Sequence, residues 1–481
     1  MRAQKLTLSN FRNFDNLELS FEPGLTVIAG ANGAGKTNIL EALYMCSIGR
    51  SPRTRQDSLL IKKGKCTANI KLEYLRTGVS RDVGVNLSAT KGKSVIVDGM
   101  PSAKVSDIVG NFSCVYFSPD EIDIVRGGPQ YRRRFLDIIN CQISPSYMLN
   151  LKNFQHALKQ RNALLRTMKI TGEYDSALLP WDTQIMSYSL KIMLRRYNFL
   201  KSLQRIVNAI MRILTDNTET LRLTYRTFCD RLEQVHLNDL EEVYTQKVRQ
   251  NFIKDVLTHT SSVGPHLDDI EIKLCYIKNP TPKQGKDTET YEYINLRNEG
   301  SLGQQRTATL ALKIAEIFVY HQFYGEKPML FLDDVLSELD FARRQKLMNY
   351  CKHFDTVVTC TEWSYENPAP DTLFEVRDGQ VFKKEVRKED FSFEAQLNER
   401  ALEFAKKINE MPEGYFDSPM WLRPHAVSDE PICKAQKLEE ISPEEREKIL
   451  SQPLPEEEQL DEYDIWEDGG KPLKKPTRKN K

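Results

Sequence analysis

The stretch that decides the fold of this chain is Gly30-Ala31-Asn32-Gly33-Ala34-Gly35-Lys36-Thr37. It matches the phosphate-binding pattern G-x-x-x-x-G-K-[ST], in which glycines let backbone N–H groups turn toward the phosphates of a nucleotide. The apolar run at 25–29 before it predicts a buried parallel strand. Apolar residues at 39, 40, 43 and 44 predict a helix, whose N-terminal dipole adds to the anion site. A chance glycine-rich turn is the alternative, but it does not account for the strand and helix on either side.

Two side chains at the end of this loop carry its chemistry. Lys36 would reach the β- and γ-phosphates, and the Thr37 hydroxyl would ligate Mg²⁺. The sequence therefore predicts a site for a nucleoside triphosphate together with Mg²⁺.

Length and composition limit the class of protein. The 481 residues are enough for two or three compact domains, and the hydrophobic fraction of 40% is ordinary for a soluble protein with a core. No run of eighteen apolar residues exists, so no membrane span is expected, and residues 1–8 read as a strand rather than a signal peptide. The nine cysteines are scattered singly, without zinc spacing, which indicates a reducing compartment. We therefore expect a cytoplasmic protein.

The net charge of +1 hides an asymmetry along the chain. Residues 387–481 carry 23 acidic and 16 basic side chains, a net −7, which leaves +8 for the rest. A basic body suits a polyanionic partner. Its densest basic cluster is Arg132, Arg133 and Arg134, which we predict to contact DNA phosphates. The alternative is that these arginines pair with nearby acids such as Asp137 in a helix.

The pattern along the chain predicts an α/β fold interrupted by helices. Alternating apolar residues at 6–9 and 17–21 predict an antiparallel pair of strands, and 68–74 predicts a strand that extends their sheet. The apolar residues 356–359 predict a strand that neighbours a core strand at 329–333. The segments 151–168 and 185–213 predict long amphipathic helices. We divide the chain into a first α/β part (1–125), an inserted helical lobe (126–255), a second α/β part (256–386) and a charged C-terminal extension (387–481). In the extension we expect one amphipathic helix at 395–408 and otherwise a solvated, partly disordered tail.

A second motif supplies carboxylates for the nucleotide site. The apolar strand Met329-Leu-Phe-Leu-Asp333 delivers Asp333 and Asp334 at its carboxyl end, the ligand-binding edge of parallel sheets. Asp333 would hold Mg²⁺ opposite Thr37, and Asp334 would orient or activate the attacking water. Adjacent strand residues point to opposite faces, so both can act only if the strand ends here and the chain turns. The alternative is an aspartate pair that caps a turn.

A third motif lies about thirty residues before that strand. In Glu299-Gly-Ser301-Leu-Gly303-Gln304-Gln-Arg306 a turn of small residues leads into a helix predicted at 307–320. A serine and exposed N–H groups at a helix start form an anion site, although an ordinary N-cap is the alternative. Two phosphate-binding helix starts in one chain suggest a nucleotide held between two copies.

In the order phosphate loop, S-x-G-Q signature, two-carboxylate strand and the S-E-L-D loop that ends at Asp340, the chain resembles the ABC-type ATPases of the SMC and RecF group. It is most similar to the RecF branch of that group. The resemblance covers residues 1–386 and is carried by the stretches 8–13, 30–44, 127–137, 158–166, 264–266, 303–306 and 332–340.

The resemblance implies an ABC-type P-loop ATPase head with ATP and Mg²⁺ as cofactors, acting as an ATP-dependent homodimer. Ser301, Gly303 and Gln304 of one copy would act in trans on the nucleotide held by residues 30–37 of the other, and Asp340 would lie in a loop that crosses the interface. The dimer would grip double-stranded DNA and gap junctions, and slow hydrolysis at Asp334 would release it. In this family the clamp serves DNA repair, replication and the SOS response with RecR- and RecO-type mediators.

The sequence departs from the family pattern at three places, one of which is the extension after residue 386, which has no counterpart in the family. Leu267 follows Gly264-Pro-His266 where a basic residue is usual, and Pro52 replaces a histidine or aromatic residue in the loop 49–54. Other functions stay open beside the clamp. One is a nucleotide-gated scaffold with negligible turnover; a transporter subunit is disfavoured by the absence of an L-S-G-G-Q form. A nuclease is disfavoured because no further acidic cluster offers a second two-metal site.

Overall fold

The computed structural model describes residues 1–387 apart from 103, 169–173, 230–231, 233–236, 279–289, 352, 365–366 and 378. The predictions for the C-terminal extension, including the helix at 395–408, lie outside the described residues. The helices and strands follow in chain order: β1 Arg2–Phe11, β2 Phe14–Ser20, β3 Leu25–Gly30, α1 Lys36–Ile48, β4 Thr67–Arg76, β5 Val79–Ser88, β6 Gly92–Val97, β7 Met100–Ser102, β8 Cys114–Phe117, α2 Asp123–Arg126, α3 Pro129–Ile143, α4 Pro145–Leu165, α5 Leu179–Leu214, β9 Glu219–Arg226, α6 Leu237–Gln250, α7 Phe252–Thr258, β10 Asp269–Lys278, β11 Thr290–Asn295, α8 Leu296–Glu299, α9 Leu302–Tyr324, β12 Met329–Asp333, α10 Phe341–Cys351, β13 Thr356–Cys360, β14 Thr372–Arg377 and β15 Gln380–Lys384.

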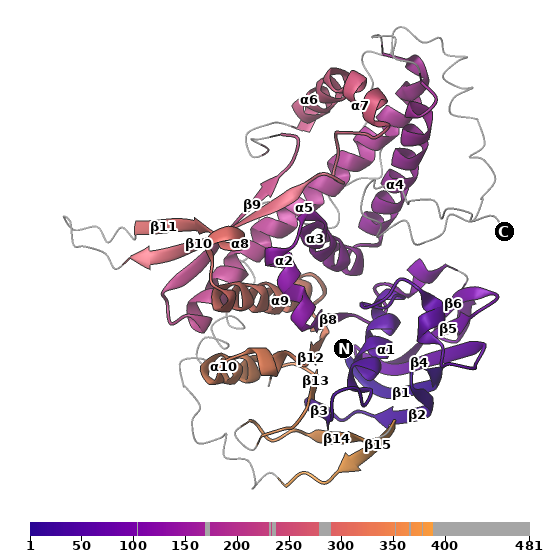
Figure 1. Ribbon diagram of the computed structural model, residues 1–481, viewed down its shortest axis with the longest axis vertical. Helices are drawn as coiled ribbons and strands as arrows, with labels where there is room; N and C mark the ends of the chain where they lie inside the picture. Colours follow the sequence, from indigo (N-terminus) through magenta and orange to yellow (C-terminus); the bar gives the residue numbers. More distant parts are fainter. Residues whose placement is uncertain are drawn as a thin grey trace, which may run out of the picture.

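Two six-stranded sheets form the body of the molecule (Figure 1). The first is antiparallel, with strand order β2-β1-β4-β5-β6-β7, and Leu6 of β1 lies opposite Leu19 of β2. The second has the order β15-β14-β3-β13-β12-β8, in which every neighbouring pair is parallel except β14 and β15. The predicted pairing of the first two strands, its extension by β4, and the neighbouring positions of β12 and β13 are confirmed.

Four strands of the second sheet, β3, β8, β12 and β13, are buried on both faces, which explains why they are almost continuously apolar, whereas β14 and β15 carry charged residues. Successive side chains point to opposite faces, so Val27 and Leu330 enter one core whereas Ile28 and Phe331 enter the other. On the Ile28 face lies α1, and beyond α1 lies the inner face of the antiparallel sheet. The helix that follows the phosphate loop is therefore held between two sheets.

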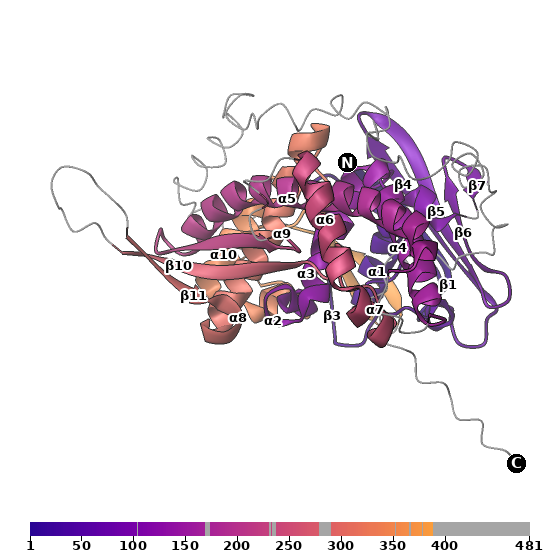
Figure 2. The ribbon, with the colours of Figure 1, turned by 90° about the horizontal axis from the view of Figure 1, so that it is seen from above.

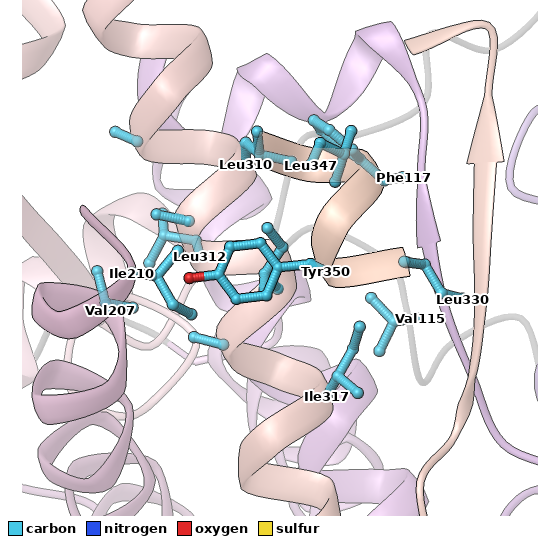
Figure 3. Close-up of a cluster of buried hydrophobic side chains, with 14 of the residues drawn as sticks. Val115, Phe117, Val207, Ile210, Leu310, Leu312, Ile317, Leu330, Leu347 and Tyr350 are labelled. Atoms are coloured by element: carbon cyan, nitrogen blue, oxygen red, sulfur yellow. The ribbon is translucent and has the colours of Figure 1, made fainter. Parts of the chain in front are cut away.

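The other face of the second sheet is covered by α9, α10 and the long helix α5. In Figure 3, Val115 and Leu330 of the sheet lie on one side of the Tyr350 ring of α10, and Leu312 of α9 and Ile210 of α5 lie on the other side. The 36-residue α5 packs against α9 at one end and α4 at the other, so it ties the helical lobe to the sheet. The long helix predicted at 185–213 is confirmed.

The lobe carries α4, α6 and α7 at its outer end, and a third sheet projects from its side (Figures 1 and 2). This sheet has the order β11-β10-β9, and Leu221 of β9 lies opposite Leu274 of β10. The segment 126–255 thus contributes a strand as well as helices, and the division at 255/256 passes through a sheet. Leu221 and Leu223 pack this strand onto the core that includes α5, and the backbone groups of β9 find their partners in β10.

No helix in the described part of the chain is long and apolar enough to cross a membrane. The predicted α/β architecture is confirmed.

Candidate nucleotide site

The phosphate loop joins β3 to α1 through a backbone that only glycine adopts readily. Gly30, Gly33 and Gly35 have φ values of 155°, 82° and 115°. A Cβ on Gly30 would approach the Val376 carbonyl oxygen to 2.5 Å, and one on Gly35 would approach the Asn13 amide to 2.5 Å. Both close approaches and the left-handed backbone exclude a side chain at these positions.

Lys36 begins α1 and is nearly buried, with 6% of its surface exposed. Its ammonium donates to the Gly30 carbonyl at 2.7 Å and to the Ala31 carbonyl at 2.9 Å. The charge is therefore held inside the curve of the loop, at the positive end of the α1 dipole. Loop, lysine and dipole together form an anion site.

Asp333 ends β12 and is the centre of a small network of hydroxyl groups. Thr37 Oγ1 donates to Asp333 Oδ1 at 2.9 Å, and Thr359 Oγ1 donates to the same oxygen at 2.8 Å. The buried Tyr116 hydroxyl donates to Oδ2 at 2.7 Å. The structure thus brings together Thr37 and Asp333, the two residues that the sequence assigns to Mg²⁺. Hydroxyl and carboxylate oxygens are the ligands that this cation prefers.

Asp334 follows in a left-handed turn, with φ 54° and ψ 24°. The backbone N–H of Asp334 donates to Thr359, which holds the turn in place. The strand therefore ends at Asp333 and the chain turns at Asp334. This turn is the condition under which both carboxylates can act at the same site. Partial burial raises the pKa of Asp334 above its ordinary value, the nearby Lys36 opposes the rise, and Asp333 adds to it. A carboxylate with a raised pKa at this edge is a better proton acceptor than an exposed one.

The signature turn leads directly into α9, which begins at Leu302 and so five residues before the predicted start at 307. Ser301 is the N-cap: its hydroxyl accepts from the Gln304 N–H at 3.2 Å, while the Gln304 side-chain carbonyl oxygen accepts from the Ser301 N–H at 2.9 Å. This reciprocal capping box, in which the acceptor for the Ser301 N–H is the side-chain oxygen Oε1 of Gln304, explains the early start, because it satisfies N–H groups that would otherwise lack partners. Ser301 and Leu302 are exposed.

The side chain of Gln304, which is predicted to act in trans, forms hydrogen bonds within its own chain. Its amide nitrogen donates to Glu219 of β9 at 2.7 Å and to the Tyr276 hydroxyl of β10 at 3.0 Å. Both ends of the amide are therefore engaged within the same copy of the chain. Ser301 is left as the exposed polar group of the turn.

The loop after β12 is tied to the signature helix. Arg306 of α9 forms an ion pair with Glu338 and also donates to the Glu338 carbonyl at 3.2 Å. The exposed Asp340 accepts from the Arg343 N–H at 2.9 Å at the start of α10, which lowers the pKa of Asp340. Among the described residues no hydrogen bond joins Ser301 or Gly303 to the phosphate loop. The signature and the 337–340 loop thus form a unit apart from the residues 30–37 of the same chain.

The three arginines predicted to bind DNA have different surroundings. Arg132 is buried and forms a bidentate ion pair with Asp269, so it is a structural residue and its assignment to DNA is wrong. Arg133 donates to the Asp268 carbonyl at 2.9 Å. Arg134 is exposed. The alternative of pairing with acids holds for Arg132, but the acid comes from β10 rather than from the same helix.

Several residues at this site were not predicted from sequence. Tyr116 and Thr359 hold Asp333, and Glu219 and Tyr276 hold Gln304. Each lies in a strand, far along the chain from the residue it contacts. The sequence offered a hint for Thr359 alone, because the predicted pairing of β12 with β13 places it beside Asp333.

The chain matches the family model described as RecF/RecN/SMC N terminal domain over residues 2–378. It is 34% identical over 386 residues to the DNA replication and repair protein RecF of Lachnoclostridium phytofermentans, covering 80% of this chain and all of that protein. To the protein of the same name from Halalkalibacterium halodurans it is 36% identical over 388 residues, with the same coverage.

Two solved structures agree with this relation. They are titled structures of the recombination mediator protein RecF in the RecFOR pathway, one with ATP and one designated RecF-ATPrS. Each is 28% identical, has a TM-score of 0.70, and covers 80% of this chain and 98% of the other. The α/β fold with its phosphate loop is thus an ATPase head of the SMC and RecF type, and the chain belongs to the RecF family.

Proposed function

We propose that this protein is an ATP-dependent, DNA-binding dimeric clamp that serves recombinational repair and replication restart in the cytoplasm. The observation that carries the proposal is the contact of Thr37 with Asp333, at 2.9 Å, beside an inward-held Lys36. Residues distant in sequence meet there to form one half of a nucleotide site.

The residues present fit ATP with Mg²⁺. The loop N–H groups and Lys36 would hold the phosphates, and the oxygens of Thr37 and Asp333 would hold the cation. When bound, Mg²⁺ neutralises phosphate charge. The similarity to a RecF structure with ATP supports the choice of nucleotide.

The other half of the site would come from a second copy of the chain. Ser301 of the signature and Asp340 of the loop after β12 are exposed, and in the described structure neither is hydrogen-bonded to the phosphate loop of its own chain. Two helix starts, at α1 and α9, would then enclose the triphosphate from opposite sides. A nucleotide bound in this way stabilises the dimer only while its γ-phosphate is present.

Hydrolysis would end the clamped state. Asp334, with its raised pKa, lies next to Asp333 and would orient the attacking water and accept its proton. We propose that this turnover is slow, that it is linked to DNA, and that it drives release. We further propose double-stranded DNA and gap junctions as ligands and RecR- and RecO-type mediators as partners in loading the recombinase at gaps. Both structural relatives are RecF proteins of the RecFOR pathway, which supports these partners.

The test is DNA binding by the full-length protein with ATP, with ADP and without nucleotide. We expect ATP to raise affinity for duplex DNA at least about tenfold, and Lys36→Arg to fold normally but lose hydrolysis, because Arg cannot follow the path of the Lys36 ammonium between the loop carbonyls. Equal DNA affinity in all three nucleotide states, with and without a RecR-type partner, would refute the proposal.

A further inference from the structure

A cavity of about 180 Å³ lies beside α1 and carries a strong positive charge. Its lining includes Arg50, Arg53 and Arg55 from the loop after α1, Lys93 of β6 and Arg134 of α3. One acid, Asp57, also lines it. Because three separate segments of the chain bring these basic groups together, the cluster is a product of the fold rather than a run of charges in the sequence.

The acid does not neutralise the cavity. Asp57 is held by Lys93 at 3.0 Å, and Arg53 leans toward the buried Glu41 at 3.9 Å. Arg55 and Arg134 are both exposed, and within the residues that the structure describes neither forms a hydrogen bond or an ion pair. Two guanidinium groups that face a cavity without an acidic partner are suited to a phosphate, which their planar fork can bind in bidentate fashion.

Hydrogen bonds connect this cavity to the phosphate loop. Arg53 donates to Asn38 Oδ1 at 3.1 Å, and the Asn38 amide donates to Asn13 Oδ1 at 2.8 Å. The Asn13 amide in turn donates to the Ala34 carbonyl of the phosphate loop at 3.1 Å. An anion that binds Arg53 would therefore change the hydrogen bonds of Asn38 and Asn13, and Asn13 is bonded to the phosphate loop.

From this geometry we propose that the cavity binds a backbone phosphate of DNA, with Arg55 and Arg134 as its primary contacts and Arg53 as the link to the nucleotide. The inference rests on the proposed function and locates part of its DNA contact. It replaces the predicted triplet 132–134, of which only Arg134 is placed for this role. Each phosphate contact releases counterions, so it contributes to affinity and to the salt dependence of binding.

The experiment compares the full-length wild type with the double variant Arg55→Gln/Arg134→Gln. Arg166→Gln is the control. Arg166 is exposed at the C-terminal end of α4, outside the cavity lining, and its substitution removes a guanidinium charge in the same way. With ATP present, we expect the double variant to bind duplex DNA about tenfold or more weakly at moderate salt. The slope of log affinity against log salt should fall by roughly 2, about 0.9 for each contact. ATP affinity without DNA should be unchanged, and Arg166→Gln should bind like the wild type.

Two outcomes would overturn the proposal. One is a double variant whose DNA affinity and salt slope equal those of Arg166→Gln. The other is a double variant that loses ATP affinity in the absence of DNA, since the cavity would then take the nucleotide's phosphates. A wild type that shows no ATP-dependent DNA binding would instead refute the proposed function, so the two failures are distinguishable.

Discussion

The side-chain amide of Gln304 donates a hydrogen bond of 2.7 Å to Glu219, 85 residues earlier in the chain. The bond fastens the signature turn to β9, and the Tyr276 hydroxyl fastens it to β10. The orientation of Ser301 therefore depends on the sheet that projects from the lobe, and in the proposed dimer a change in this sheet would alter the contact of Ser301 with the nucleotide.

Removing this anchor should weaken the dimer without affecting the phosphate loop. For Glu219→Ala/Tyr276→Phe we expect the ATP-dependent dimer to dissociate about five- to tenfold more readily, since about 1 kcal/mol is typical of a lost hydrogen bond. Light scattering against protein concentration measures this, and ATP affinity at low concentration should be unchanged. Glu242→Ala, an exposed acid on α6, serves as control. Dimer affinity equal to that control would count against the anchor.

Asp334→Asn should separate clamping from turnover. Asparagine keeps the size and the turn but cannot accept a proton, so we expect ATP hydrolysis to fall by about 10²–10⁴-fold. ATP-dependent DNA binding should persist, with slower release. Phosphate release and DNA dissociation kinetics measure the two effects. Full repair proficiency of this variant in cells would favour a scaffold without turnover.

The pH profile should show the raised pKa of Asp334. A base works when deprotonated, so hydrolysis should fall on acidification at a pH above the ordinary carboxylate value of 3.8. The residual activity of Asp334→Asn should not show this step. A wild-type profile that is flat down to pH 4 would exclude Asp334 as the base.

Ser301→Arg should block dimerisation, because a large cation would occupy the exposed face that the second copy must approach. ATP binding should remain, and the mass of the particle by light scattering should stay that of one chain. The substitution also removes an N-cap, which costs about 1 kcal/mol. Ser301→Asn retains the cap and serves as the control. We expect Ser301→Arg to be folded but monomeric with ATP, and Ser301→Asn to form the dimer.

Tyr116→Phe tests how the proposed Mg²⁺ ligand Asp333 is held in place. The change leaves Asp333 Oδ2 buried without its donor, which should lower the free energy of unfolding by about 1–3 kcal/mol. Mg²⁺ with ATP should restore part of the loss, since the cation would take up the carboxylate. Urea unfolding with and without both ligands measures this. Tyr44→Phe is the control, because its ring packs beside Tyr116 but its hydroxyl does not reach Asp333.

His266 should make stability depend on pH. Burial lowers the pKa of His266 to about 4, and its buried Nδ1 has no hydrogen-bond partner among the residues that the structure describes. The unfolded chain, with a histidine pKa of 6.5, therefore binds the proton more readily than the folded one. Stability should fall as pH drops from about 6.5 to 4. The difference in urea midpoint between the wild type and His266→Gln should shrink over that range; a constant difference would contradict the assignment.

The sequence by itself determined the elements whose causes are local. Residues 25–37 predict strand, loop and helix because the apolar run, the glycines and the helical spacing act over a few residues. The end of β12 at Asp333 could likewise be anticipated from the chemistry of two adjacent carboxylates. Ser301 was identified as a helix start, but the helix was placed five residues late because the capping box with Gln304 was not recognised.

Only the tertiary structure decided which distant side chains meet. Positions 37, 116 and 359 converge on Asp333 because three different strands end and helix α1 begins at one edge of a sheet, and no local pattern encodes that convergence. The same reason separates Arg132 from Arg134. Each step along a helix turns the side chain by about 100°, so Arg132 and Arg134 point to different sides of α3. Arg132 is buried against Asp269, whereas Arg134 lines the cavity beside α1.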